Sequence, residues 1–502
     1  MDPMTPLPEP PPTDRAALLE RLAARREPWD MLIIGGGATG LALALDAATR
    51  GLAVLLVEAH DFAKGTSSRA TKLLHGGVRY LAQGHLPLVR EALRERSTLL
   101  AMAPGLSHRL AFVMPSYRLG RSPFYGAGLV LYDLLAGSQR IERTRYLSRA
   151  DLLARLPSLK PEGLRDGVEY WDGQFDDAGL ALALARGAAA QGALVINHCA
   201  VTAPRHTFGR IIGAELRDAE SGQTLNVSAR CVVNATGVWV DALRQQDAEL
   251  RGESCRAIVA PSQGLHLVVS RDFWPYEQAL LVPDTGDGRV MFAVPWLGKV
   301  VLGTTDTPRA DLPLEPEASR ALVDAILSET ARYLRRPPTR ADVLSHWSGI
   351  RPLVRGGADG GATAGISREH TIEVSPSGLV TVTGGKWTTC RAMAEDILSS
   401  CERHGLTGPL PPCRTASLRL PEAPVHDAAA APDAQAVHRY VHREWARSVE
   451  DVLARRSRLL FLDAAAAERA APAVAEALAR ETGREPGLDD FVRLARQYQQ
   501  LP

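Results

Sequence analysis

The chain has 502 residues, of which 45% are hydrophobic and 23% charged, and its 58 basic and 57 acidic side chains leave a net charge of +1. This length suits two or three domains around a large core, and the balanced charge excludes a general attraction to nucleic acid. The six cysteines form no C-x-x-C pair and no zinc-like spacing. We therefore expect reduced thiols, no disulfide framework and no metal site.

The first 27 residues form an extension with two parts. Residues 1–13 are rich in proline, and residues 14–26 carry alanines and leucines at helical spacing among arginines. The apolar run of a signal peptide is missing, and no stretch reaches the roughly 18 apolar residues of a membrane span. The basic helix could contact an anionic membrane, or it could pack on the protein's own surface, which is the interpretation that we favour.

Residues 30–58 have the pattern of strand, glycine turn, helix and strand. The turn is Gly35-Gly36-Gly37-Ala38-Thr39-Gly40, and the second strand ends in Glu58, about twenty residues later, as in a dinucleotide-binding fold. Gly35 permits a sharp turn, Gly37 a close approach of a pyrophosphate, and Gly40 close packing of helix on strand. Glu58 can accept hydrogen bonds from both ribose hydroxyls and would repel a 2′-phosphate, which favours FAD or NAD over NADP.

The segment after Glu58 is rich in small hydroxyl residues and ends in a His-Gly-Gly turn. It lies between a strand and a helix, where such residues can donate hydrogen bonds to a cofactor and approach a flat ring closely. Its candidate cofactor contacts are Thr66, Ser67, Ser68, Lys72, Leu74, His75 and Gly76.

Later segments predict that the dinucleotide domain is interrupted and then resumed. Short strands around 194–201 and 209–216 have hairpin spacing, and an apolar strand over 229–237 ends in a turn that can close back on the cofactor. Between 258 and 307 short β-branched runs alternate with turns, which is typical of an antiparallel sheet. Prolines and alanines from about residue 409 precede helical periodicity over 436–480, which predicts a linker and an all-α C-terminal domain.

Several motifs together resemble the FAD-linked glycerol-3-phosphate dehydrogenases, a family within the D-amino-acid-oxidase-like flavoproteins. The most specific motif is GTSSRATKLLHGGVRYL at 65–81. Further matches are DGQFDDA at 172–178, NATGVWVD at 234–241, GTTDT at 303–307, GIRPL at 349–353 and GGKWTT at 384–389. The resemblance extends over residues 28–400, with a looser similarity in 444–456.

Residue patterns and resemblance together predict an α/β fold: a discontinuous Rossmann-like FAD-binding domain, an antiparallel β substrate domain and an all-α C-terminal domain. The expected FAD-binding ranges are 28–100, 165–245 and 345–405. The substrate or cap domain is expected over 101–164 and 246–344, and the helical domain over 410–502, with 1–27 as the N-terminal extension.

Oxidation of a secondary alcohol phosphate requires a flavin N5 facing the carbinol carbon, a base for the hydroxyl proton, and cations for a near dianion. The resemblance supplies Arg79 with Tyr80, Arg351, Arg368 and Lys386 around the phosphate. His266, at the start of a strand, is our candidate base. Lys386 could also stabilise the reduced ring at its N1–O2 edge. Further cofactor contacts by resemblance are Val201, Ala235, Gly237, Gly385 and Thr388.

Two positions depart from the family pattern. Glu369 follows Arg368 where an aspartate is usual, and Cys390 follows the paired threonines where a tyrosine is common. Neither departure changes the charge of the predicted site, so they affect fine specificity rather than the substrate class.

The sequence therefore predicts FAD-dependent oxidation of sn-glycerol 3-phosphate to dihydroxyacetone phosphate, with electrons passed to a quinone. The resemblance implies a cytoplasmic enzyme bound peripherally to the inner face of the cell membrane, and it makes a homodimer plausible. Candidate membrane contacts are residues 14–26 and 443–458. Two alternatives stay open: an amine or 2-hydroxy-acid oxidase on the same fold, and a non-catalytic or NAD-binding module in which the glycine turn only holds a ligand.

Overall fold

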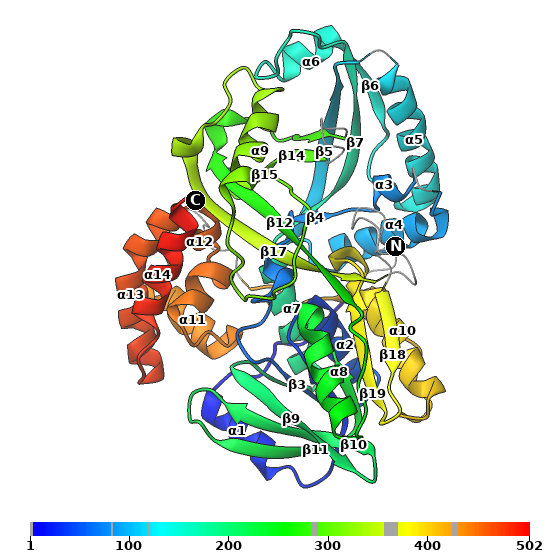
Figure 1. Cartoon of the computed structure of the whole chain (residues 1–502), viewed down its shortest axis with the longest axis vertical. Coiled ribbons are helices and arrows are strands. Elements are labelled where there is room, and N and C mark those ends of the chain that lie inside the picture. The colour runs from blue at the N-terminus through cyan, green and yellow to red at the C-terminus, as the bar shows by residue number, and fades with distance from the viewer. Residues whose placement is uncertain (1–3, 82–83, 119, 284–289, 356–369, 424–429) are drawn as a thin grey trace.

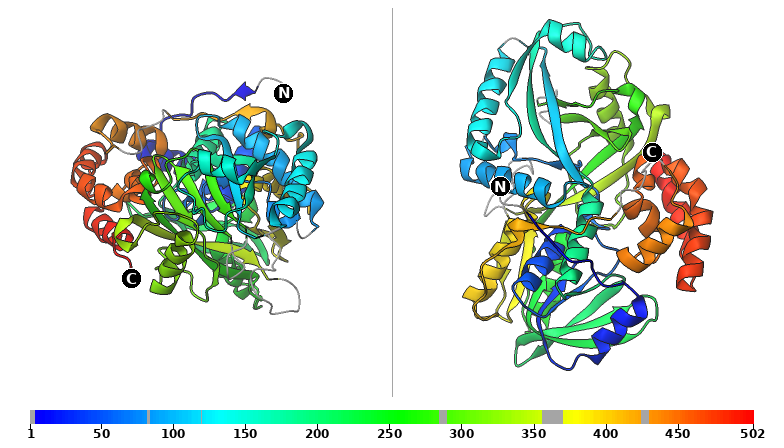
Figure 2. Two further views of the ribbon diagram at one scale, coloured as in Figure 1. Left: turned by 90° about the horizontal axis from the view of Figure 1, so that it is seen from above. Right: turned by 180° about the vertical axis from the view of Figure 1, so that it is seen from behind.

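Two large β-sheets and a group of C-terminal helices make up the molecule (Figure 1). The computed structural model describes residues 4–81, 84–118, 120–283, 290–355, 370–423 and 430–502. In Figure 1 one sheet lies above the other, and the C-terminal helices lie at one side, beside the junction of the two. The view from behind in Figure 2 shows the same arrangement.

The lower sheet has eight strands and contains the predicted dinucleotide fold. Its main order is β18-β19-β11-β2-β3-β8, in which β19, β11, β2, β3 and β8 are parallel, β18 is antiparallel at the edge, and β10 and β9 extend from β11. The bounds are β2 (Trp29–Ile34), β3 (Val54–Val57), β8 (Leu194–Ile196), β9 (Cys199–Thr207), β10 (Arg210–Asp218), β11 (Thr224–Asn234), β18 (His370–Val374) and β19 (Leu379–Gly384).

Helices α2 (Ala38–Thr49), α7 (Asp177–Ala190) and α10 (Cys390–Arg403) share a core with this sheet. α2 packs against both of the others. Met31, Leu32 and Ile33 of β2 are completely buried, as expected for a parallel strand whose two faces are both covered. Helix α8 (Val240–Glu249) follows β11.

The upper sheet has ten strands and is almost entirely antiparallel. Its order is β16-β12-β15-β14-β13-β5-β7-β4, with β17 added on β12 and β6 on β7; the pair β13 and β5 is parallel. The bounds are β4 (Leu73–Leu74), β5 (Ser107–Ser116), β6 (Arg145–Ser148), β7 (Asp166–Phe175), β12 (Val259–Ser270), β13 (Ala279–Val282), β14 (Met291–Trp296), β15 (Lys299–Gly303), β16 (Thr307–Pro308) and β17 (Val343–Val354). The helices here are α3 (Val78–Leu81), α4 (Leu86–Met102), α5 (Arg121–Ala136), α6 (Arg149–Arg155) and α9 (Arg320–Ala331).

Three strands of the upper sheet consist of residues that we expected in the cofactor domain. We assigned residues 28–100, 165–245 and 345–405 to the cofactor domain, but β4, β7 and most of β17 pair within the substrate sheet. An apolar strand has the same local pattern in either sheet, and its partner is chosen by distant pairing: β7 runs along the whole of β5, and β17 along most of β12.

The C-terminal region is helical, as predicted. It comprises α11 (Ala434–Glu444), a π-helical turn (Asp451–Arg456), α12 (Leu459–Leu462), α13 (Ala464–Thr482) and α14 (Leu488–Gln499). Phe461 packs against Trp347 of the substrate sheet, whereas Trp445 lies in the core of the cofactor sheet. The helical region therefore contacts both sheets.

The N-terminal arm packs on the protein itself. In α1 (Arg15–Ala24) Leu18 and Leu22 are buried, and Arg15 pairs with the buried Asp218 and donates to the Asn197 carbonyl at 2.6 Å. Before it, β1 (Thr5–Pro6) pairs in parallel with β20 (Leu418–Arg419). The apolar side of this helix is thus directed into the protein, in agreement with the favoured interpretation.

Candidate active site

A cavity of about 1610 Å³ lies between the two sheets. Its lining comes from the glycine turn after β2, from the end of β3, from the segment 59–81, and from β12, β17 and the turn after β19. A pocket for one drug-sized ligand occupies about 300–1,000 Å³, so this cavity has room for a dinucleotide and a small substrate together.

The glycine turn leaves space that a side chain would fill. A Cβ on Gly35, whose φ is +114°, would lie 2.6 Å from the Ala235 carbonyl oxygen, and a Cβ on Gly40 would lie 2.0 Å from the Gly35 carbonyl oxygen. Gly37 caps the start of α2 and lines the cavity together with Thr39. The backbone N–H groups at this helix start therefore adjoin an open space that fits a pyrophosphate.

Glu58 lies at the end of β3 and lines the same cavity. Its two carboxylate oxygens accept hydrogen bonds from the backbone N–H groups of Gly36, at 2.7 Å, and of His60, at 2.9 Å. Burial raises the pKa of Glu58 above its usual range, against the effect of these two donors. Each oxygen can still accept a further hydrogen bond, so ribose binding by Glu58 stays a prediction with which this geometry is compatible.

The predicted flavin contacts meet at the other side of the cavity. Lys386 Nζ lies 3.8 Å from the ring centroid of Tyr80, and Thr388 Oγ1 accepts a hydrogen bond from the His75 N–H at 3.2 Å. The predicted cofactor residues that line the cavity are Gly35, Gly37, Thr39, Glu58, Thr66, Ser67, His75, Val201, Ala235, Gly237, Gly385, Lys386 and Thr388. These residues fit FAD, because the glycine turn that suits a nucleotide and a second group of polar residues around Lys386 line the same cavity.

His266 and Arg351 reach the cavity from the neighbouring strands β12 and β17. In the antiparallel register His266 lies opposite Trp347, and Arg351 lies opposite Ser262. Along the paired strands His266 and Arg351 are therefore four positions apart. Because this spacing is even, their side chains project from the same face of the sheet. Between them, Gly264 leaves the guanidinium its space, because a Cβ there would lie 2.4 Å from Arg351 Nη2.

The hydrogen bonds of Arg351 place its guanidinium at the cavity wall. Nη1 donates to the Thr305 carbonyl and Nη2 to Thr304 Oγ1, both at 3.0 Å, and the Asp306 carboxylate lies 3.3 Å away. A planar guanidinium at a cavity wall has the geometry that binds phosphate oxygens well.

The imidazole of His266 is buried and oriented by its neighbours. Nε2 lies 3.0 Å from Thr71 Oγ1, and the ring stacks on Trp347 with 5.4 Å between centroids. Burial, together with the positive charge of Arg351, lowers the pKa of His266 well below 6.5. The ring is therefore neutral at pH 7 and can accept a proton.

Five predicted cofactor residues do not line the cavity: Gly40, Ser68, Lys72, Leu74 and Gly76. Gly40 serves helix packing instead. Lys72 is completely buried, paired with Asp177 at 2.7 Å and bonded to the Ser68 carbonyl at 2.7 Å, so it organises the segment from behind rather than touching a ligand. The prediction of Lys72 as a ligand contact was wrong because its motif does not show on which side of the chain the ammonium lies.

Two of the predicted phosphate-binding arginines have no described side-chain position. Arg79 belongs to α3, and Arg368 lies outside the described residues, as does Glu369. Cys390 is buried at the start of α10 and does not line the cavity, so this departure leaves the cavity wall unchanged.

Sequence reasoning missed several residues that shape the substrate end: Thr71, Gly264, Thr304, Asp306 and Trp347. Thr71, Thr304 and Asp306 lie inside the quoted motifs, and Gly264 lies two residues before His266. Their contribution depends on the register of β12 with β15 and β17, which a single sequence does not reveal.

Comparison with known proteins shows to which family the chain belongs. Residues 30–399 match the family of FAD-dependent oxidoreductases, and residues 413–486 match the C-terminal domain of alpha-glycerophosphate oxidase. The mitochondrial glycerol-3-phosphate dehydrogenase of Saccharomyces cerevisiae is 41% identical over 82% of this chain and 69% of its own length. The chain belongs to the FAD-dependent glycerol-3-phosphate dehydrogenase family.

Other members of this family agree over nearly the whole chain. The human mitochondrial glycerol-3-phosphate dehydrogenase is 38% identical, over 96% of this chain and 73% of its own length. The structure of the glycerol-3-phosphate dehydrogenase from Bacillus halodurans, complexed with FAD, superimposes with a TM-score of 0.76 at 26% identity, covering 97% of this chain and 98% of that one. As a member of this family the protein is an FAD-dependent enzyme.

Proposed function

We propose that the protein oxidises sn-glycerol 3-phosphate to dihydroxyacetone phosphate and passes the electrons to a quinone. The observation that carries the proposal is the placement of His266 and Arg351 on one face of adjacent strands, in the same cavity as the nucleotide-binding turn. A base and a phosphate-binding cation thus share one space with the cofactor site. Bound FAD supplies the hydride acceptor, at N5 of its ring system.

Each residue then has a defined task. Arg351 binds phosphate oxygens, with Lys386 as a second cation in the cavity and Arg79 and Arg368 as candidates by resemblance. Neutral His266 accepts the proton of the C2 hydroxyl as the carbon loses its hydride, so that the C–O bond becomes a carbonyl. Thr71 holds the imidazole in position. Two electrons leave with the hydride and reduce a quinone, with two protons, to the quinol.

Helix α5 supports a peripheral contact with the membrane. Leu129 and Tyr132 are buried on one side of it, whereas Phe124 is 64% and Leu134 69% exposed on the other. Phe124 and Leu129 also line the cavity, so an apolar surface opens beside the site. Such a surface fits the boundary between lipid headgroups and acyl chains. We place the protein on the inner face of the cell membrane, in the cytoplasm.

The segments first expected to touch the membrane fit less well. The apolar side of α1 is buried, and Arg455, Arg456 and Arg458 are buried in ion pairs. Among the helices of the described ranges, none has both the length and the apolar character needed to cross a membrane.

A vesicle-binding experiment tests the assignment of α5 as the membrane contact. The double variant F124S/L134S should bind phosphatidylglycerol vesicles more weakly than the wild type in a flotation assay, whereas F208S, at a fully exposed phenylalanine elsewhere, should not. Equal binding by the wild type, F124S/L134S and F208S would exclude α5 as the membrane contact.

Anaerobic bleaching of the bound flavin tests the reaction. We expect sn-glycerol 3-phosphate to bleach the flavin, and glycerol and lactate to leave it oxidised at the same concentration. Bleaching by lactate or an amine instead would favour the alternative, an oxidase of a 2-hydroxy acid or amine on this fold. A quinone analogue, rather than oxygen, should restore the colour fastest. A homodimer, which the family resemblance makes plausible, can be checked by light scattering.

A further inference from the structure

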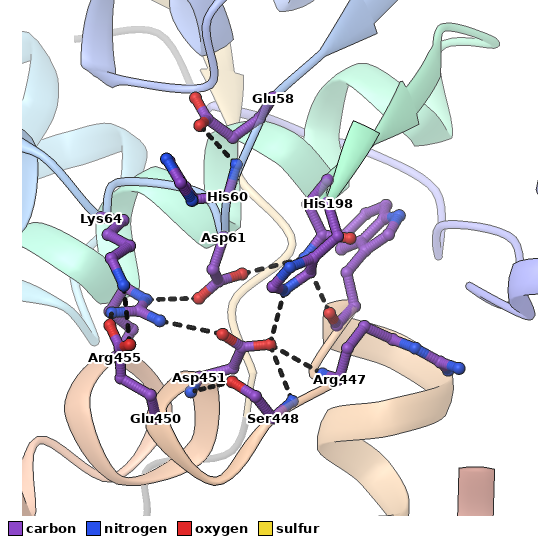
Figure 3. A network of polar contacts seen from close by, with 12 residues as sticks. Glu58, His60, Asp61, Lys64, His198, Arg447, Ser448, Glu450, Asp451 and Arg455 are labelled. Carbon is purple, nitrogen blue, oxygen red and sulfur yellow. Dashed lines mark hydrogen bonds and ion pairs between the residues drawn. The ribbon is translucent and has the colours of Figure 1, made fainter. Parts of the chain in front are cut away.

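The segment 58–66 supplies part of the cofactor site but lies between β3 and the short helical turn at Thr66–Ser68. It contributes Glu58, His60 and Lys64 to the cavity wall. A segment outside the regular elements needs other contacts to keep its side chains in place. In this protein Glu58 and His60 form backbone hydrogen bonds with residues 196–199, and the side chains that follow them are held by the C-terminal helical region, as Figure 3 shows.

Asp61 is the centre of these contacts. Its side chain is completely buried, and it accepts hydrogen bonds from the guanidinium groups of Arg455 and Arg456 and from Asn197 Nδ2 at 3.0 Å. Arg456 makes a second bond to Asp61, at 2.9 Å, across a sequence separation of 395 residues. One carboxylate from the cofactor segment thus pairs with two arginines of the C-terminal region in a site without solvent, and Glu450 and Asp451 add further negative charge beside Arg455.

Two residues that follow Asp61 also contact the C-terminal region. Lys64 Nζ pairs with Glu450 at 2.7 Å, and Glu450 also binds Arg455 at 2.7 Å. The ring of Phe62 meets Trp445 edge-on, with 5.5 Å between centroids.

On its other side Phe62 presses on the nucleotide-binding turn. A Cβ on Gly36 would lie 2.6 Å from Phe62 Cδ1, and the Ala63 N–H donates to the Gly36 carbonyl at 2.9 Å. The C-terminal region therefore contacts the segment, and the segment contacts the turn.

We infer that Asp61 is a positioning residue for FAD: through its bonds to Arg455 and Arg456, the C-terminal region holds the segment that presents Glu58, His60 and Lys64 to the nucleotide end of the cofactor. Docking of the C-terminal region and FAD affinity are then thermodynamically coupled. Because coupling is reciprocal, bound FAD must also tighten the docking of the C-terminal helices.

The test compares D61N with D247N in the full-length protein. Asp247 is the matched control because it is also a buried aspartate, bonded to His206 at 2.8 Å and to Ser375 at 2.9 Å, but neither it nor these partners line the cavity. FAD affinity is measured by titrating each FAD-free protein and following flavin fluorescence. D61N should weaken FAD binding by about 10-fold or more, within the usual range of a coupling between two sites, and D247N should leave it within about 2-fold of the wild type.

The kinetic pattern separates positioning from general damage. At saturating FAD, D61N should keep kcat and the KM for sn-glycerol 3-phosphate, since the residue touches neither substrate nor the reacting atoms. Unchanged FAD affinity in D61N, or an equal loss in D247N, would overturn the inference. Loss of bleaching by sn-glycerol 3-phosphate with normal FAD affinity would instead count against the proposed reaction.

A milder variant decides the matter if D61N does not fold. Glu450 is only partly buried and bridges Lys64 to Arg455, so E450Q should weaken FAD binding in the same direction by a smaller factor. Hydrogen exchange of the wild-type protein adds a second measurement: adding FAD should slow exchange of the backbone amides in 446–458. Exchange there that does not respond to FAD would refute the coupling.

Discussion

Replacing Arg351 offers the sharpest test of the phosphate site. Its guanidinium is anchored by Thr304 and the Thr305 carbonyl, each at 3.0 Å, and lies 3.3 Å from Asp306. R351L removes the cation and leaves Asp306 facing the substrate phosphate. A hydrogen bond to a charged group contributes about 1.5–3 kcal/mol, so losing two costs about 3–6 kcal/mol, or about 10²- to 10⁴-fold in kcat/KM.

The matched variant R351K keeps the charge but not the planar fork, so we expect an intermediate loss. The assay is anaerobic flavin reduction at increasing sn-glycerol 3-phosphate, together with the flavin content of each variant. Glycerol lacks the phosphate, so the advantage of the phosphorylated substrate over glycerol should shrink in R351L. Unchanged kcat/KM in R351L would exclude Arg351 from substrate binding, and loss of bound FAD would show that its role lies elsewhere.

Three further variants test the proposed base, the glycine turn and an ion pair outside the cavity. H266Q should retain FAD but lose about 10²- to 10⁴-fold in kcat/KM. Because the pKa of His266 is lowered, kcat/KM of the wild type should stay level above pH 6.5 and fall only on further acidification; a fall that begins above pH 6.5 would contradict this role. G35A places a Cβ 2.6 Å from the Ala235 carbonyl oxygen at a φ of +114°, so flavin content and melting temperature should both fall; normal values would refute a tight turn. Burial of His198 acts to lower its pKa, but the Asp451 carboxylate, 2.9 Å away, has the larger effect and raises the pKa of His198. The stability that this ion pair contributes is therefore complete below pH 6.5 and is lost as pH rises through the folded-state pKa. Between pH 6 and 9 the melting temperature should fall more steeply in the wild type than in H198Q. Parallel curves would contradict a stabilising His198–Asp451 pair.

The nucleotide end of the site could be predicted from local sequence. Gly35, Gly37 and Glu58 lie in one strand-turn-helix-strand unit, and the spacing of such a unit already determines which residues meet a pyrophosphate and a ribose. The motif at 65–81 located the next part of the cavity but not the direction of each side chain. Thr66 and His75 line the cavity, whereas Lys72 turns to Asp177.

The sequence by itself determined the cofactor class, the presence of a β-rich substrate unit and the helical C-terminal region, because strand and helix periodicities and glycine turns act over a few residues. Only the tertiary structure decided that β7 and β17 join the substrate sheet, and that His266 and Arg351 share one face. It also revealed that Asp61 meets Arg456, 395 residues away. These outcomes depend on strand register and on the pairing of buried charges, and such contacts are selected by packing between distant segments rather than by local preference.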